Sequence, residues 1–289
     1  CRRNYERLNR YRMSKITASE VNRLRQMTGS GMMDCKKALV EAEGDFDKAI
    51  EILRKKGQKV AANRGDREAS EGLAISLTND SANIGVISVL GCETDFVAKN
   101  AEFMETATKF AELALAAGCA TVEDVKALDF GGGLTVGEKI IEMIGKIGEK
   151  IEISAYDMIK ADSVVAYNHP GNQVATLVGL NKQGETVLEA GRDVAMQIAA
   201  MNPVALDKDG VATSVIEKEI EIGKDIARQE GKPEEMLEKI AQGKLNKFFK
   251  ENTLLSQAFI KDNKKSVEQM LKDIDGSLTV TSFKRHALN

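Results

Sequence analysis

Residues 72–98 read GLAISLTNDSANIGVISVLGCETDFVA, and their pattern sets the architecture expected for the whole chain. In LAISL and again in IGVISVL, apolar residues follow a period of two, which predicts two strands. The residues between them, Asn79-Asp80-Ser81, are typical of a turn, so the strands are expected to pair as a β-hairpin. A long alanine-rich helix is expected to follow, over residues 98–117.

A similar unit lies further along the chain. Strands are expected at residues 164–167 and from Val174, with a turn around His169 between them and a helix over Glu185–Met201. The likeness between the two units lies in pattern more than in identity. Two hairpin-plus-helix units predict an α+β fold with an internally duplicated core.

Three short helices are expected ahead of the first hairpin. Thr17 and Glu20 have the spacing of a capping box, and apolar residues recur after them at helical spacing. A second amphipathic stretch covers residues 32–43, and Asp45 can cap a third helix. Three helices so close in sequence predict a compact bundle. Residues 55–71 are polar and charged, which is typical of a linker or of an exposed helix.

Residues 213–250 are rich in charge and helical in pattern, with one break at Gly231-Lys232-Pro233. Two helices hinged at this break are expected to lie antiparallel, as a helical hairpin that projects from the core. Apolar positions give each helix a stripe along which the pair can pack. The chain is then expected to return through a helix at Val267–Ile274 and a closing strand at residues 278–283.

Composition limits the classes of function. The 289 residues are 43% hydrophobic, which is enough to build real cores, and only 4% aromatic, with no tryptophan. With few aromatic rings for base stacking and a net charge of −3, the chain is not expected to bind nucleic acid directly. No apolar run is long enough to span a membrane, so no membrane partner is expected.

The cysteines, at positions 1, 35, 92 and 119, form no C-x-x-C pair and have no histidine at ligand spacing, so neither a metal site nor a cofactor is expected. Free thiols without a secretory signal favour a reducing compartment, and we expect the cytoplasm. Residues 1–12 carry five arginines against one glutamate and precede Met13. We interpret them as a basic extension outside the fold, with an organelle-targeting remnant as the alternative.

Enzymatic interpretations find little support. Residues 132–139 (GGLTVGEK) resemble a phosphate-binding loop in glycine spacing, but Glu138 stands where that loop needs a lysine. They are interpreted as a loop that enters a helix. A thiol enzyme built on Cys92 is an alternative that the acidic neighbours of this residue disfavour. His169 and His286 have no recognisable nucleophile partner, so covalent catalysis is not expected.

The residues Thr94-Asp95-Phe96-Val97 stand out because they lie where the second strand of the hairpin gives way to a helix. On composition alone, Phe96 is expected to pack into the core, and outward presentation at a loop tip is the alternative. On the same ground, His169 is expected to be an exposed turn residue. The charged helical hairpin also has two interpretations, a solvated structural arm or a docking surface.

Two motifs are similar to signatures of the elongation factor Ts family. Residues 28–39 (TGSGMMDCKKAL) resemble its N-terminal signature, which usually has alanine where Ser30 stands, and residues 92–98 (CETDFVA) resemble its second signature. Three shorter motifs continue the resemblance, KIGE, QIAA and GKP, at residues 146–149, 197–200 and 231–233. The resemblance covers nearly everything from Met13 onward.

The resemblance implies a guanine-nucleotide exchange factor that performs no covalent chemistry and binds elongation factor Tu in its GDP-bound and nucleotide-free forms. It implies a ubiquitin-associated-like (UBA-like) three-helix domain, a core of two related α+β subdomains and a protruding antiparallel coiled-coil hairpin. The chain is then divided into six parts. The first three are the basic extension (1–12), the UBA-like domain with its linker (13–67) and the N subdomain (68–160). The others are the first part of the C subdomain (161–212), the coiled-coil hairpin (213–250) and the rest of the C subdomain (251–289).

The resemblance also implies how the partner's nucleotide is loosened. The four residues Thr94, Asp95, Phe96 and Val97 are implied to intrude between helices of the partner's GTP-binding domain, near its magnesium and phosphate site. Displacement of the Mg²⁺ ion then promotes the release of GDP. This role reverses the expectation that Phe96 packs into the core.

Other residues are implied to dock on the same partner. Met32, Met33 and Lys36 of the three-helix domain are implied to contact the partner's GTP-binding domain, and His169 to reach toward its other end. Dimers occur among relatives, so a homodimer or a 2:2 complex is left open. A C-terminal helical module of some relatives is expected to be absent, and the extension before Met13 has no counterpart in the family. A passive scaffold, which binds without accelerating release, is the remaining alternative.

Overall fold

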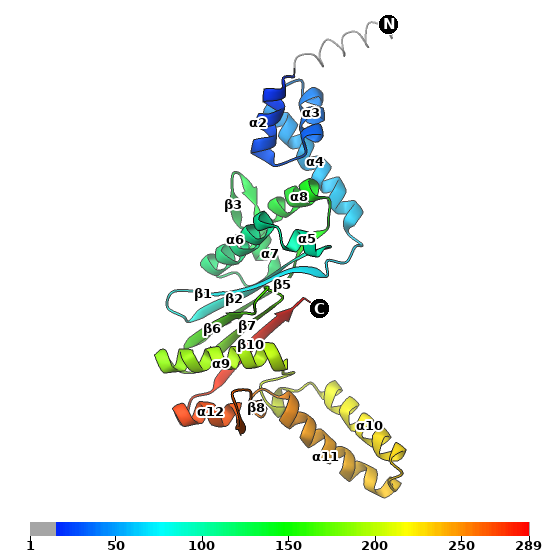
Figure 1. The fold of residues 1–289 in the computed structure, drawn as a ribbon, viewed down its shortest axis with the longest axis vertical. Helices are drawn as coiled ribbons and strands as arrows, with labels where there is room; N and C mark the ends of the chain where they lie inside the picture. Colours follow the sequence, from blue (N-terminus) through cyan, green and yellow to red (C-terminus); the bar gives the residue numbers. More distant parts are fainter. Residues whose placement is uncertain (1–15, 289) are drawn as a thin grey trace.

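The computed structural model describes residues 16–288 and combines helices with small antiparallel sheets, which confirms the predicted α+β class. The predicted extension at residues 1–12 lies outside the described residues. Figure 1 shows an elongated molecule, with helices at one end, two sheets in the middle and a pair of helices at the other end. Among residues 16–288, no helix has both the length and the apolar character that a membrane span needs.

Three helices form the N-terminal bundle: α2 (Ala18–Thr28), α3 (Met32–Glu41) and α4 (Phe46–Arg64). The predicted capping box is present, because the Thr17 hydroxyl accepts from the Glu20 N–H and the Glu20 carboxylate accepts from the Thr17 N–H. Leu24 and Leu39 are fully buried between the helices. Since α4 continues to Arg64, the segment at residues 55–71 is a helix over its first part and a connection only after that.

The predicted hairpin is present as β1 (Glu71–Thr78) and β2 (Ile84–Cys92), which pair antiparallel. The strand β5 (Ile151–Lys160), which the sequence did not predict, pairs with the other side of β2 and gives the order β1-β2-β5. One face of this sheet is covered by α6 (Ala101–Ala117), α7 (Val122–Ala127) and α8 (Val136–Ile147), with a short ribbon of β3 (Asp129–Gly131) and β4 (Leu134–Thr135) before α8. Phe103 and Phe110 fill the core between these helices and the sheet.

The helix expected at about residues 98–117 is present and ends where it was predicted, but it starts three residues later. The chain first forms a separate short helix, α5 (Asp95–Ala98), and α6 begins only at Ala101. The reason is Asn100, whose side-chain oxygen accepts hydrogen bonds from the N–H groups of Glu102 and Phe103 and caps a new helix. The hairpin is therefore followed by the four-residue helix α5, which is separate from α6.

The second predicted hairpin is β6 (Ser163–Asn168) and β7 (Val174–Leu180), in a sheet of order β10-β7-β6 with β10 (Val280–Ala287). The helices α9 (Glu185–Met201) and α12 (Val267–Ile274) pack on this sheet at their predicted positions, beside a small ribbon of β8 (Ala258–Phe259) and β9 (Asp262–Ser266). The closing strand runs over 280–287 instead of 278–283. It starts later because a turn comes first, in which the Leu278 N–H donates to the Asp275 carbonyl at 2.9 Å.

The two sheets pack face to face, and their strands alternate accordingly. On β1, Ile75 points toward the helices α6, α7 and α8, whereas Ala74 lies between the sheets. On β7, Val178 points toward α9 and Leu177 lies between the sheets. The molecule therefore has helices on both outer sides of a central pair of sheets (Figure 1).

One edge of this pair is joined by a side chain and a backbone carbonyl instead of a strand. The Asn168 amide accepts from the Ser76 N–H at 2.7 Å and donates to the Ser76 carbonyl at 2.9 Å. The Ala74 N–H donates to the Asn172 carbonyl at 2.7 Å. The last residue of β6 and the turn after it thus occupy backbone groups of β1 that face away from β2.

The helical hairpin predicted for residues 213–250 is present as α10 (Thr213–Gln229) and α11 (Glu234–Asn252), which pack antiparallel and project from the second sheet (Figure 1). The short 3₁₀ helix η1 (Lys208–Gly210) precedes α10. The break lies where it was predicted, and Gly231 adopts a φ of +73° there, which favours glycine. Ala227, Leu237 and Ala241 are buried between the two helices.

Candidate functional site

Among the described residues, Phe96 is the most exposed large apolar side chain, with 83% of its surface accessible. It lies on α5, directly after the hairpin strand β2. A four-residue helix offers few positions to the core, and these are taken by Ala98, which is buried, and Val97, which packs on the first core. The expectation that Phe96 packs into the core is therefore wrong. We call residues 94–97 the α5 tip.

Thr94, immediately before α5, is held by a carboxylate from a distant segment. Its N–H donates to Glu149 Oε2 at 3.1 Å, and its hydroxyl donates to Glu149 Oε1 at 2.7 Å. Glu149 follows Gly148, whose φ of +83° lets the chain turn away from the end of α8. The two hydrogen bonds fix the backbone from which α5 starts.

A second carboxylate, that of Glu93, connects the same backbone to the end of α4. It accepts two hydrogen bonds from Arg64 Nη1, at 3.1 and 3.0 Å, and one from the Lys150 N–H at 2.7 Å. The Lys150 ammonium donates to the carbonyls of Gly65 and Arg67, at 3.2 and 2.9 Å. The chain that leaves the N-terminal bundle is thereby joined to the base of the α5 tip.

Asp95 and Lys99 form an exposed ion pair beside Phe96, with 2.7 Å between Oδ2 and Nζ. The hydrogen bond from Lys99 lowers the pKa of Asp95, so its carboxylate is ionised at neutral pH. The same hydrogen bond raises the pKa of Lys99. The α5 tip thus presents an aromatic ring next to an exposed ion pair.

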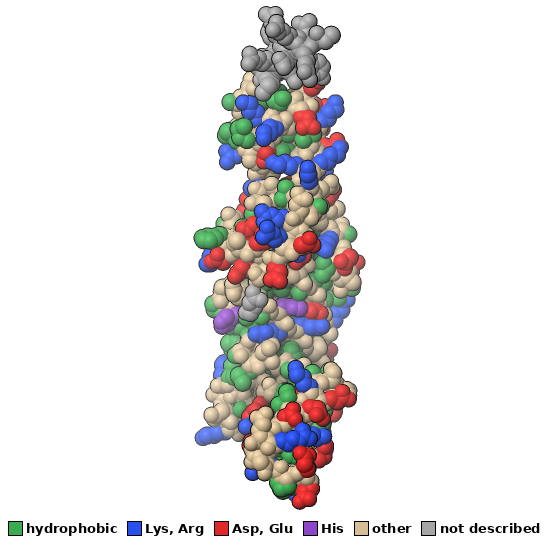
Figure 2. All heavy atoms as spheres, turned by 90° about the vertical axis from the view of Figure 1, so that its right-hand side faces the viewer, with side chains coloured by type: hydrophobic (Ala, Val, Ile, Leu, Met, Phe, Trp, Pro, Cys, Tyr) green, Lys and Arg blue, Asp and Glu red, His purple; other side chains and the backbone are tan. Residues whose placement is uncertain are grey.

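The N-terminal bundle carries a second exposed apolar area. Met27, Met32 and Met33 expose 56%, 53% and 63% of their side chains, and Lys36 on α3 is exposed as well. We call Met32, Met33 and Lys36, which lie together in the first part of α3, the methionine surface. Figure 2 shows apolar and basic side chains close together at this end of the molecule. Flexible thioether side chains adapt to the shape of a partner, which suits a docking surface.

His169 lies in the turn between β6 and β7 and is exposed, as expected from composition. Its Nδ1 is 3.0 Å from the Tyr167 hydroxyl, and its N–H donates to the Val174 carbonyl at 2.8 Å. The structure therefore places the predicted site residues on three separate elements: the α5 tip, helix α3 and the turn after β6. Such an arrangement suits contact with a large partner better than capture of a small molecule.

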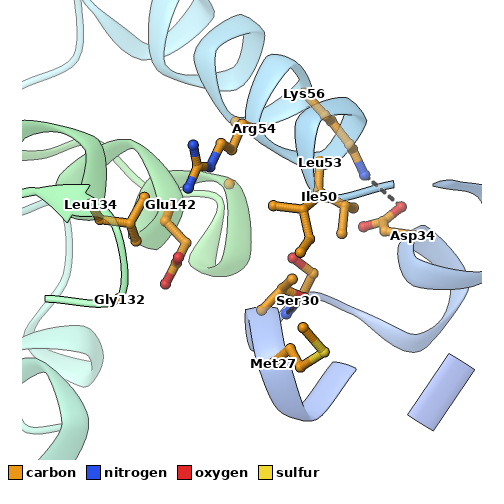
Figure 3. Close-up of a pocket in the computed structure, with 13 residues that line it drawn as sticks. Met27, Ser30, Asp34, Ile50, Leu53, Arg54, Lys56, Gly132, Leu134 and Glu142 are labelled. Atoms are coloured by element: carbon orange, nitrogen blue, oxygen red, sulfur yellow. Dashed lines mark hydrogen bonds and ion pairs between the residues drawn. The ribbon is translucent and has the colours of Figure 1, made fainter. Parts of the chain in front are cut away.

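A cavity of about 190 Å³ lies between the N-terminal bundle and α8 (Figure 3). Its lining includes Met27, Ile50, Arg54, Gly132, Leu134 and Glu142. Gly132 and Leu134 belong to the segment that resembles a phosphate-binding loop. There, the Thr135 hydroxyl accepts from the Glu138 N–H, and the Glu138 carboxylate accepts from the Thr135 N–H. This capping box occupies two donors that a phosphate would need, and the segment is a turn that enters α8, as interpreted.

The thiols of Cys35, Cys92 and Cys119 are free and buried, and Cys1 lies outside the described residues. Burial, reinforced by the charge of Glu149, raises the pKa of Cys92 to about 12, so this thiol is protonated at neutral pH. A cysteine nucleophile needs the thiolate and access to solvent, and Cys92 has neither. Within residues 16–288, no three His, Cys, Asp or Glu side chains are grouped so that they could hold a metal ion.

Known proteins are similar in sequence to this chain over most of its length. A family model described as Elongation factor TS matches residues 93–289. A protein named elongation factor Ts from Amoebophilus asiaticus (strain 5a2) is 59% identical over 271 residues, which cover 93% of this chain and 98% of that protein. The protein of the same name from Christiangramia forsetii is 58% identical over 276 residues, covering 96% of this chain and 100% of that protein. The chain belongs to the elongation factor Ts family.

In this member of the elongation factor Ts family, sequence patterns located the α5 tip but not the side chains that hold it. Two of the quoted motifs contain such a side chain, because KIGE ends at Glu149 and CETDFVA includes Glu93. No pattern paired Glu93 with Arg64 or Lys150, since these partners lie 29 and 57 positions away and meet Glu93 only in the fold.

Proposed function

We propose that this member of the elongation factor Ts family is a guanine-nucleotide exchange factor, which binds elongation factor Tu and promotes the release of GDP during translation elongation. Family membership supports an exchange role in translation. The single observation that carries the mechanism is the exposed Phe96 on a short helix with a fixed base. The protein acts by binding and needs no covalent step, so we regard it as a regulator and not as an enzyme.

Exchange follows from a difference in affinity. An exchange factor must bind the nucleotide-free partner more tightly than the loaded one. Nucleotide then weakens the binding of the exchange factor by the same factor. A coupling on the order of 10⁴ corresponds to about 5.5 kcal/mol of differential binding. Burial of one large side chain contributes about 1.5–3 kcal/mol, so contacts beyond Phe96 must supply the rest.

We assign the role of wedge to the α5 tip. Phe96 enters between helices of the partner's GTP-binding domain, with Thr94 and Val97 at the base of the wedge and Asp95 beside the magnesium and phosphate site. Mg²⁺ demands near-ideal octahedral geometry, so a small shift of the partner's ligands is enough to weaken the ion. Loss of the ion then weakens the binding of GDP.

Two further areas hold the complex together in this proposal. The methionine surface offers adaptable apolar contact and the charge of Lys36, within an N-terminal bundle that we propose to be UBA-like. His169, on the second sheet, reaches toward the other end of the partner. We propose that α10 and α11 form a coiled-coil arm. We also propose that the free protein is either a monomer or a homodimer, and that the homodimer forms a 2:2 complex with the partner. Buried free thiols favour a reducing compartment, for which we propose the cytoplasm.

Stopped-flow release of a fluorescent GDP analogue from elongation factor Tu tests the proposal. Saturating amounts of the chain are expected to accelerate release by about 100-fold or more over the spontaneous rate. A passive scaffold would bind the partner in calorimetry and leave the release rate unchanged, which would refute the proposal. A phosphate-handling enzyme would bind GDP by itself, whereas calorimetry of the chain with GDP alone is expected to show no binding.

A further inference from the structure

The α5 tip depends on a contact that its own sequence does not provide. A helix of four residues has little stability of its own, because helix nucleation is costly. Thr94 occupies the N-cap position of α5, yet its side chain makes no hydrogen bond to the helix. The hydroxyl donates to Glu149 Oε1 instead, while the Thr94 N–H donates to Glu149 Oε2. Both polar donors of Thr94 are therefore directed to one carboxylate.

The residue after Glu149 connects it to the chain that leaves the bundle. Lys150 binds Glu93 through its N–H and binds two carbonyls just after α4 through its ammonium. Glu93 in turn holds Arg64, the last residue of α4. The side chains of Glu93 and Lys150 are only 16% and 19% exposed, and the contacts that Glu93 makes with Arg64 and the Lys150 N–H are partly buried.

Lys146, on the last turn of α8, makes a separate contact with the bundle. A Cβ placed on Gly29 would lie 2.9 Å from Lys146 Nζ, so the lysine side chain lies directly over this glycine at the end of α2. The same ammonium pairs with Glu102 at the start of α6, at 2.7 and 2.6 Å. Residues 146–150 therefore contact the bundle, α6 and the base of the α5 tip.

We propose that Glu149 is a positioning residue for nucleotide exchange: it fixes the direction in which Phe96 leaves the surface, relative to the bundle that carries Met32 and Met33. The inference rests on the proposed exchange function. A partner that has docked on the methionine surface then meets Phe96 at a set place and angle, and less conformational entropy is lost in the later step in which Phe96 enters the partner. Loss of Glu149 frees the α5 tip without removing any side chain that touches the partner.

Two substitutions at this position differ in the hydrogen bonds they keep. In Glu149→Gln, the amide oxygen can still accept from the Thr94 N–H, and the amide nitrogen can donate to the Thr94 hydroxyl. Glu149→Ala removes both bonds. The effect on exchange is therefore expected to be graded, with the glutamine variant between the wild type and the alanine variant. Thr94→Val removes the hydroxyl but keeps the shape of the side chain, and it tests the same contact from the other side.

The test measures GDP release from elongation factor Tu as a function of the concentration of the full chain. Glu149→Ala is expected to lower the maximal release rate about tenfold, which corresponds to about 1.4 kcal/mol. The concentration that gives half the maximal rate is expected to stay within about threefold, because the docking surfaces are intact. Glu123→Gln, an exposed glutamate of the same half that pairs only loosely with Lys126, is the matched control and is expected to behave as wild type.

Amide hydrogen exchange of residues 94–100, measured on the free chain by mass spectrometry, is the second readout. It is expected to be faster in Glu149→Ala and Thr94→Val and unchanged in Glu123→Gln, while global thermal unfolding stays close to that of the wild type. Wild-type release in the alanine variant, or unaltered hydrogen exchange, would overturn the positioning role. The positioning role would also be overturned if Glu149→Ala lowered the maximal release rate and the affinity for the partner equally and also lowered the melting temperature. If the wild-type chain fails to accelerate release, the proposed function is refuted. The hydrogen-exchange measurement would then still test whether Glu149 holds Thr94 and the α5 tip.

Discussion

Phe96 combines an exposed ring with a fixed backbone. The ring belongs to none of the core clusters of residues 16–288, whereas Thr94 before it is hydrogen-bonded and Ala98 after it is buried. A large side chain placed in this way contributes to binding far more than to folding. Substitutions at the α5 tip should therefore separate function from stability.

Phe96→Ala is expected to lower the maximal rate of GDP release about 30-fold, the equivalent of about 2 kcal/mol for a residue at the centre of an interface. Because the ring is exposed, the free energy of unfolding is expected to change by less than about 0.5 kcal/mol. Asp95→Ala is expected to slow release as well and to leave the fold intact, since its pair with Lys99 lies on the surface. Stopped-flow release and urea denaturation measure the two effects.

Ile274→Ala is the matched control for Phe96, because Ile274 is also an exposed apolar residue but lies at the end of α12. It is expected to leave both release and stability unchanged. Equal release rates in the wild type, Phe96→Ala and Asp95→Ala would rule out the wedge.

The place of the α5 tip could be read from the sequence, because the period of two ends at Cys92 and polar residues follow. Its orientation could not. Which residues of a four-residue helix face the core depends on what packs against it, and here Val97 and Ala98 take those positions. The carboxylate that binds Thr94 lies 55 positions away, beyond the reach of any local pattern.

At the scale of elements, α4 and α8 cross at two glycines. A Cβ on Gly145 would lie 2.9 Å from the Cα of Gly57, and a Cβ on Gly57 would lie 3.0 Å from the Ile141 carbonyl. The two backbones therefore approach as closely as only glycine permits. This crossing fixes the N-terminal bundle against the first half of the core.

Gly145→Ala is expected to lower the free energy of unfolding by about 1–3 kcal/mol, because the added methyl group pushes the two helices apart. Gly243→Ala on α11 is the matched control, since a Cβ there meets no atom within 4 Å. In an open helical position alanine is favoured over glycine, so this control is expected to be more stable by up to about 1 kcal/mol. Urea denaturation measures both, and a stabilised Gly145→Ala would contradict the close crossing.

The two sheets are joined by charge as well as by packing. The Asp157 carboxylate on β5 accepts hydrogen bonds from Lys284 Nζ and His286 Nε2 on β10, both at 2.7 Å. Burial opposes the ionisation of Asp157, but these two hydrogen bonds outweigh it, and the pKa of Asp157 lies below its usual value.

A lowered pKa in the folded chain gives a stabilisation that acid removes. The contribution of Asp157 is complete above the unfolded pKa of about 3.9 and is lost as the pH falls through the lower folded pKa. Asp157→Asn is expected to lower the free energy of unfolding by about 1–3 kcal/mol at neutral pH, and by less at pH values below 4. Urea denaturation across this range measures the difference, with the exposed Asp66→Asn as control. A difference that does not change with pH would contradict the assignment.

At the scale of the whole molecule, the helical pair α10 and α11 leaves and rejoins the core at one place. The Val204 N–H donates to the Asn252 carbonyl, and the Leu254 N–H donates to the Ala205 carbonyl, both at 2.9 Å. Within the part of the chain that the structure describes, no residue of 213–250 belongs to the cores around the two sheets. The arm is thus an addition to a core that is complete without it.

Replacement of residues 213–250 by a six-residue glycine-serine linker is expected to preserve the core. Such a linker reaches up to about 20 Å, which exceeds the roughly 8–10 Å between the axes of packed helices. Thermal unfolding followed by circular dichroism is expected to remain cooperative, with a melting temperature within a few degrees of the wild type. The shortened chain is also expected to keep most of its maximal release rate, because the α5 tip and the methionine surface are untouched. A chain that no longer unfolds cooperatively would show that the arm supports the core.

The general plan of the molecule could be predicted because each part has a local signal: a capping box, two hairpins and a helical pair with a glycine-proline break. The strand β5 escaped prediction for a physical reason. A bulge shifts its register between Ile153 and Ala155, so residues of odd number face the helices before it and residues of even number, such as Tyr156, face them after it. Because the alternation of buried and exposed residues changes phase within the ten residues of β5, the sequence shows no continuous period of two there.

The contact between Asn168 and β1 has a consequence outside the single molecule. An edge strand with free N–H and carbonyl groups is a template for strands of other chains, and β1 is the edge of its sheet. The side chain of Asn168 and the carbonyl of Asn172 occupy the N–H groups of Ser76 and Ala74. The same hydrogen bonds that join the two halves therefore protect this edge from intermolecular pairing and aggregation.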